Sequence, residues 1–121
     1  MKKALPLLFL TLVTASAEAA SADKPNPANY TTVVHVQASR IAYLCQSPDL
    51  CSLWQQLQVT IDGKKYGLST NIKSYSILRV GDYNAKVNKD QSKNAYEYDR
   101  SYEFLFPDGA TRVYEVSGEE Q

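Results

Sequence analysis

Residues 57–68 read LQVTIDGKKYGL, and this stretch decides the fold class. Leu57, Val59 and Ile61 alternate with polar residues, which is the period of a β-strand with one buried face. Asp62-Gly63 follows directly and favours a two-residue type I′ turn, because both central residues of that turn need positive φ. A hairpin closed there places apolar residues opposite one another on one face. The predicted partners are Ile61 with Lys64, Val59 with Tyr66, and Leu57 with Leu68.

The same alternation recurs on both sides of this hairpin. A first strand begins near Tyr30, with Val34 and Val36 on one face, and continues past a bend near Ser39 to Leu44. Further strands are expected at 83–87, 96–106 and 111–116, and Pro107-Asp108-Gly109 turns the chain between the last two. A three-residue loop there sets Phe104 opposite Arg112 and Tyr102 opposite Tyr114.

Helical periodicity is absent, and Leu50–Leu57 makes at most one short helical turn. About seven strands with turn signals between them predict an all-β fold, a single small antiparallel sandwich or barrel.

The N-terminus has the layout of a signal peptide. Lys2 and Lys3 precede an apolar run from Ala4 to Ala15, and small residues permit cleavage after 17, 19 or 22. The run is shorter than the roughly 20 apolar residues that a spanning helix needs. We therefore expect an exported protein, periplasmic or secreted, with no membrane span in its mature form. The expected organisation is a signal peptide at 1–19, a flexible leader at 20–29, a β domain at 30–118 and a tail at 119–121.

The two cysteines, Cys45 and Cys51, are expected to form a disulfide. Export delivers them to an oxidising compartment, and Pro48-Asp49 turns the chain between them. Zinc is disfavoured because the chain has one histidine, His35, and a redox pair usually shows the tighter C-x-x-C spacing.

Charge excludes some partners. From Ala20 onward, 11 Lys and Arg stand against 12 Asp and Glu, so no net field attracts nucleic acid or an anionic membrane. No phosphate loop, metal cluster or nucleophile motif is present, and we expect no cofactor, no metal and no catalytic residue.

Aromatic residues are the main candidates for binding. The nine tyrosines mostly fill the core of so small a domain, but Trp54, Tyr96 and Tyr98 lie where the pattern allows exposure. The first hypothesis is a non-enzymatic exported module that binds a protein, peptide or glycan through an aromatic or edge-strand surface. The alternative is a small hydrolase that uses the strand carboxylates Glu97, Asp99 and Glu103, or an inhibitor of a hydrolase, because residues two apart on a strand lie about 7 Å apart.

Three segments also carry a resemblance. The DGKKY hairpin, the GDY-x-A strand at 81–85 and the YEFLFPDG hairpin at 102–109 are similar to those of short, exported, functionally uncharacterised β-rich proteins of soil bacteria. The resemblance covers most of 31–118 and implies a shared fold and export, with no assigned activity.

Overall fold

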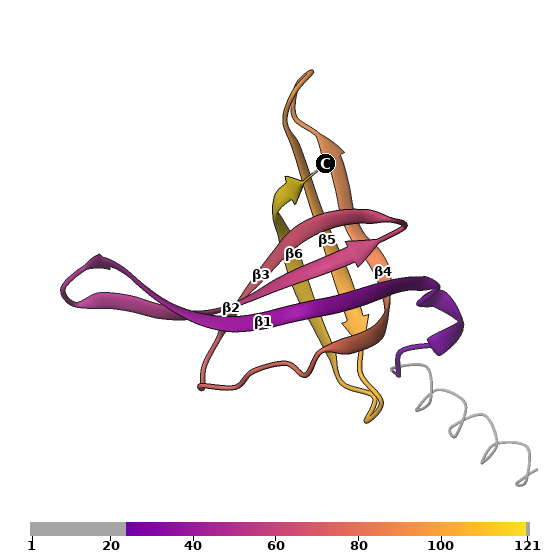
Figure 1. The fold of residues 1–121 in the computed structure, drawn as a ribbon, viewed down its shortest axis with the longest axis horizontal. Helices are drawn as coiled ribbons and strands as arrows, with labels where there is room; N and C mark the ends of the chain where they lie inside the picture. The colour runs from indigo at the N-terminus through magenta and orange to yellow at the C-terminus, as the bar shows by residue number, and fades with distance from the viewer. Residues whose placement is uncertain (1–23, 121) are drawn as a thin grey trace, which may run out of the picture.

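The computed structural model describes residues 24–120, which form six strands and one 3₁₀ turn (Figure 1). The elements are η2 (Pro27–Asn29), β1 (Thr32–Ser47), β2 (Leu50–Ile61), β3 (Lys64–Ile72), β4 (Gly81–Ser92), β5 (Tyr98–Leu105) and β6 (Thr111–Glu120). The expected signal peptide and its cleavage sites lie outside the described residues. Residues 24–120 include no helix with the length and apolarity needed to cross a membrane.

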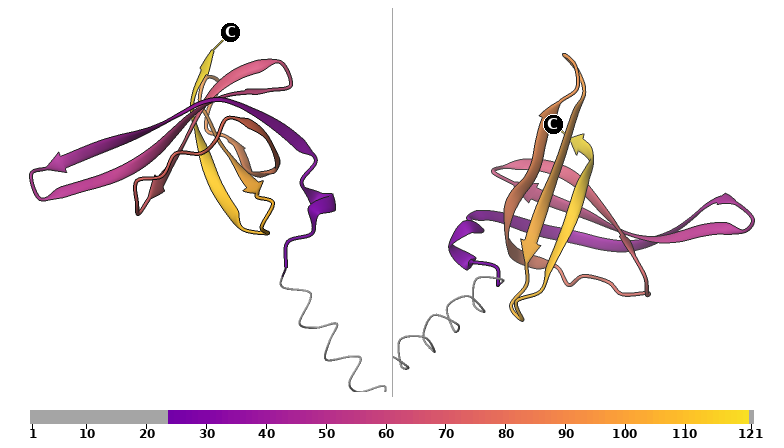
Figure 2. Two further views of the ribbon diagram at one scale, coloured as in Figure 1. Left: turned by 60° about the horizontal axis from the view of Figure 1, so that its bottom comes forward. Right: turned by 180° about the vertical axis from the view of Figure 1, so that it is seen from behind.

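The strands close into an antiparallel barrel in the order β1-β2-β3-β6-β5-β4. In Figure 1, β1, β2 and β3 form one layer that crosses the layer of β4, β5 and β6, and Figure 2 shows the same two layers from other sides. The all-β prediction is confirmed, with six strands in place of about seven. As predicted, the first strand continues past Ser39, and Thr32 to Ser47 form one continuous strand with a bulge between Val36 and Ala38. The short helical turn allowed at Leu50–Leu57 is wrong, since these residues belong to β2.

Both predicted registers are present. Ile61, Val59 and Leu57 pair with Lys64, Tyr66 and Leu68, and the turn residues Asp62 and Gly63 have φ of 51° and 80°. Phe104 pairs with Arg112 and Tyr102 with Tyr114. The expected tail is corrected, because β6 continues to Glu120 and pairs there with Lys65 of β3. The end of the expected leader forms η2, where the Asn26 side chain accepts a hydrogen bond of 3.1 Å from the Ala28 N–H.

The core lies inside the barrel. Its largest fully buried apolar side chains include Tyr114, Phe104, Leu57 and Leu68, and the rings of Phe104 and Tyr114 pack with centroids 4.6 Å apart. Tyr102 and Phe104 in the middle of β5 therefore face inward, and apolar burial of this kind is the main stabilising term of the fold.

Candidate functional site

Tyr96 and Tyr98 are both exposed and line one shallow hollow. Tyr96 lies in the loop before β5 with 86% of its surface exposed, whereas Tyr98 begins β5 and is 39% exposed. The hollow, of about 280 Å³, is completed by Lys93, Glu97 and residues 116–119 of β6. The Tyr98 hydroxyl donates a hydrogen bond of 3.1 Å to Glu119, and the Arg100 guanidinium lies 5.0 Å from the ring centre. Burial, followed by this hydrogen bond, raises the pKa of Tyr98.

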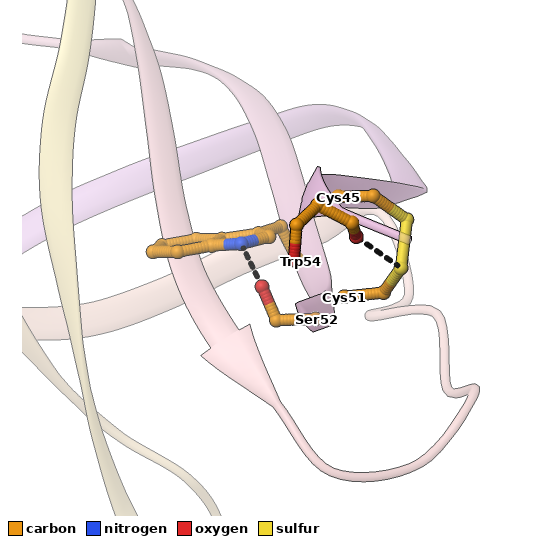
Figure 3. Close-up of a disulfide and its surroundings, with 5 residues drawn as sticks. Cys45, Cys51, Ser52 and Trp54 are labelled. Carbon is orange, nitrogen blue, oxygen red and sulfur yellow. Dashed lines mark hydrogen bonds between the residues drawn. A yellow bond between two sulfur atoms is a disulfide. The ribbon is translucent and has the colours of Figure 1, made fainter. Parts of the chain in front are cut away.

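Trp54 belongs to a different surface. It is half-buried on β2, where it pairs with Asn71, and its indole N–H donates a hydrogen bond of 2.9 Å to the Ser52 hydroxyl (Figure 3). Its hollow is lined by residues 69–71, Val113 and Glu115 and shares no residue with that of Tyr96 and Tyr98. The structure therefore brings Tyr96 and Tyr98 together but places Trp54 apart from them.

The strand carboxylates have separate partners. Glu103 accepts a short hydrogen bond from the Tyr30 hydroxyl, which raises the pKa of Tyr30. Asp99 forms an ion pair of 3.0 Å with Lys89, which lowers the pKa of Asp99. Glu97 accepts a hydrogen bond of 2.7 Å from the Asn94 side chain. A catalytic pair needs two carboxyl groups that face a common substrate, and these three engage different neighbours.

The only histidine of the chain and the aspartates of a neighbouring hollow are exposed. His35 Nδ1 lies 2.6 Å from a carboxylate oxygen of Asp82, and Asp82 lines a hollow of about 690 Å³ at one end of the barrel together with Asp108. Both aspartates are solvent-exposed, so neither has the buried surroundings of a general acid. Within residues 24–120, no group of His, Cys, Asp and Glu side chains is arranged to hold a metal ion.

The most prominent feature outside the barrel is a projecting hairpin, which we call the β1–β2 arm (residues 40–53). It extends from the barrel as a two-stranded ribbon in Figures 1 and 2. β3 pairs with β2 only as far as Leu53, and β4 pairs with β1 only as far as Val36. Beyond these pairs, the outer edge of β1 in the arm and the outer edge of β2 at residues 50–52 have no strand partner among the described residues.

A disulfide closes the tip of the arm. Cys45 and Cys51 face each other across the two strands with Cα atoms 3.9 Å apart, which confirms the predicted bond (Figure 3). This separation is shorter than the usual range of about 4.4 to 6.8 Å because the residues are direct cross-strand partners. The bridge holds two strands together where no third strand supports them.

Exposed apolar side chains extend along the arm. Tyr43 is 62% and Leu44 51% exposed, and Leu50 at the tip is exposed as well. Because side chains alternate, Ile41, Tyr43 and Leu53 continue the face that Leu57 lines inside the barrel. The arm therefore presents Tyr43, Leu44 and Leu50 to solvent, whereas Ile41 and Leu53 are half-buried.

The residue that anchors the base of the arm is Gln55. Its side chain is 1% exposed and donates a hydrogen bond of 2.8 Å to the Ser76 carbonyl, in the segment that follows β3. The side-chain carbonyl oxygen of Gln55 accepts hydrogen bonds from the hydroxyl of Tyr114 and from the guanidinium of Arg112. Neither Gln55 nor the arm was among the candidates from the sequence. The available signal was a polar residue at an inward position of the Leu57–Ile61 alternation.

Comparison with known proteins adds no neighbour: no protein-family model, no curated protein and no solved structure matches the chain.

Proposed function

We propose that this protein is an exported, non-enzymatic binding module that holds a protein or peptide partner on its β1–β2 arm. The observation that carries the proposal is the arm itself, which has an open β1 edge, a disulfide at its tip and exposed Tyr43, Leu44 and Leu50. Exposed apolar groups that gather on a projecting element are typical of interaction sites. Aromatic and leucine side chains on a rigid support also lose little conformational entropy on binding.

Export is supported by the disulfide and by the signal-peptide pattern of the first residues. The mature protein should begin between Glu18 and Asp23. Intact-mass measurement of the exported product tests this, and a persisting full-length chain in the membrane fraction contradicts it.

Site-specific photo-crosslinking tests the binding surface in the native envelope or culture fluid. A photoreactive phenylalanine analogue replaces Leu44 on the arm in one variant and Lys64, at the exposed Asp62-Gly63 turn, in the control. The proposal expects a discrete covalent adduct from position 44 and none from position 64. Equal adducts from both positions, or none from position 44, contradict it.

A glycan site at Tyr96 and Tyr98 is a second candidate, because both rings line one hollow beside Glu97 and Glu119. Stacking of a sugar on an exposed tyrosine would shift the ring resonances of these two residues in an NMR titration. Resonances that stay unchanged with a panel of envelope glycans exclude this candidate. The hydrolase alternative has less support, since each strand carboxylate has its own partner.

A further inference from the structure

The open edge of β1 has a defined set of unpaired backbone groups. Ile61 and Lys64 flank a two-residue turn and therefore form a hydrogen-bonded pair. Because such pairs alternate along antiparallel strands, odd-numbered residues of β2 bond to β3 and even-numbered residues bond to β1. The β1 residues opposite Gln55, Leu53 and Cys51 consequently direct their N–H and C=O groups away from β2. These residues are Ile41, Tyr43 and Cys45.

Two further observations agree with this assignment. The Cα separation of 3.9 Å at Cys45 and Cys51 lies nearer the roughly 4.5 Å of a non-hydrogen-bonded pair than the roughly 5.5 Å of a hydrogen-bonded pair. The alternation places the two cysteines in the same non-hydrogen-bonded class. The bulge between Val36 and Ala38 shifts the alternation along β1 by one residue. Before the bulge, the backbone N–H and C=O groups of Thr32, Val34 and Val36 point toward β4, and after it those of the odd-numbered residues point outward. The edge from 41 to 45 thus continues the line along which β1 bonds to β4.

The surroundings of this edge select the chemistry of a partner. Natural edge strands usually carry a charge, a proline or a covering loop, and residues 41–47 have no charged residue and no proline. The segment after β3 contacts β1 at Ser39, whose hydroxyl accepts a hydrogen bond of 3.2 Å from the Leu78 N–H. Tyr75 and Ile77 of the same segment are exposed.

Two segments that meet at the base of the arm carry only positive charge. Residues 37–48 and 70–81 contain the exposed cations Arg40, Lys73 and Arg79 and no aspartate or glutamate. The second segment joins the arm through the Leu53–Ile72 pair and the Gln55–Ser76 hydrogen bond. A partner that lies along the edge therefore meets apolar side chains near the tip and positive charge toward the barrel.

We propose that β1 takes up an extended segment of a partner protein as an added strand along Ile41, Tyr43 and Cys45, with alternating apolar residues and a carboxylate near the barrel end. This inference rests on the proposed function and specifies its binding mode. Strand addition of this kind draws affinity from main-chain hydrogen bonds and specificity from alternate side chains. The outward groups of residues 41–45 span about 14 Å, which a partner segment of about five residues matches.

The test uses a phage-displayed library of random peptides, about 12 residues long, selected on the mature disulfide-bonded protein. The peptides enriched should alternate apolar residues and carry an acidic residue. The informative pair of variants is Tyr43→Pro and Tyr43→Thr, since both lack the aromatic ring of tyrosine but only proline lacks the outward backbone N–H. Tyr43→Pro should bind the selected peptides about tenfold more weakly than Tyr43→Thr, because it loses a main-chain hydrogen bond and crowds the edge.

A second measurement keeps the test decisive if Tyr43→Pro disturbs the arm. Two versions of a selected peptide are compared, one N-methylated at its odd-numbered residues and one at its even-numbered residues. One version should lose binding and the other should keep it, because only every second residue of the peptide bonds to β1. Arg79→Gln should weaken binding several-fold and reduce its salt dependence, whereas Lys64→Gln at the distant turn should not.

Three outcomes overturn the inference. Selection that enriches no peptide excludes this ligand class, and selected peptides that bind Tyr43→Pro and Tyr43→Thr equally exclude the edge. Self-association in analytical ultracentrifugation that Tyr43→Pro abolishes assigns the edge to a second copy of the chain. The crosslink from position 44 distinguishes these failures from failure of the proposed function, because it records any partner on the arm.

Discussion

The side-chain amide of Gln55 donates a hydrogen bond of 2.8 Å to the carbonyl oxygen of Ser76. This contact ties the segment after β3 to the point where the arm leaves the barrel. The same side chain accepts hydrogen bonds from Tyr114 and Arg112, so one buried amide connects three parts of the chain. A buried polar group of this kind stabilises one arrangement because any other leaves its partners unpaired.

Replacing Gln55 with leucine should destabilise the protein by about 2 to 3 kcal/mol, because the buried Tyr114 hydroxyl and the Ser76 carbonyl lose their partner. Urea unfolding measures the change. Gln58→Leu is the matched control on an exposed position of the same strand, and it should alter stability by less than about 0.5 kcal/mol. Equal effects of the two substitutions would mean that the network around Gln55 contributes nothing.

Sequence patterns predicted the hairpins well, since turn chemistry and alternation are local properties. The Asp62-Gly63 turn and the Phe104–Arg112 pair both follow from residues close together in the chain. The arm was not predicted, because apolar alternation indicates burial while Tyr43 and Leu44 lie beyond the barrel.

The role of Gln55 depends on contacts with residues 21 and 59 positions away, which periodicity does not describe. The same distinction between local and long-range contacts applies to the three candidate binding residues. Tyr96 and Tyr98 share a surface because both lie near the start of β5, whereas the place of Trp54 depends on how β2 leaves the barrel.

Gly63→Val should destabilise the fold by about 1 kcal/mol or more, because a β-branched residue resists positive φ. Gly63 has φ of 80°, and a Cβ added there meets no atom within 4 Å, so the effect comes from backbone conformation alone. Asp62→Asn is the control, since asparagine adopts the left-handed region readily. A urea midpoint for Gly63→Val equal to that of the control would contradict the backbone argument.

Alkaline pH should unfold the protein partly through Tyr114. Burial raises the pKa of this phenol, so the unfolded chain releases its proton at lower pH than the folded chain does. The stabilising contribution is therefore complete below about pH 10 and is lost as the pH rises through the folded pKa. Tyr114→Phe cannot ionise, and it also lacks the hydrogen bond to Gln55, which should cost about 1 kcal/mol at pH 7.

The gap in stability between the wild type and Tyr114→Phe should narrow above about pH 10. Urea unfolding at a series of pH values measures it. Burial of Tyr102 raises the pKa of that residue as well, so part of the pH dependence remains in the variant. Stability curves that stay parallel from neutral to alkaline pH would show that Tyr114 ionises equally in both states.

Loss of the disulfide should loosen the arm and leave the barrel intact. Closing a loop of seven residues contributes about 2.4 kcal/mol in the chain-entropy description, but Cys45 and Cys51 lie at the tip, where β1 and β2 have no other strand partner. The double substitution to serine should therefore lower global stability by less than this amount, because the tip can separate without exposing the core. Hydrogen exchange followed by mass spectrometry should show faster exchange in residues 40–53 and unchanged exchange in residues 98–105. Uniformly faster exchange across both segments would place the bridge among the interactions that hold the whole domain together.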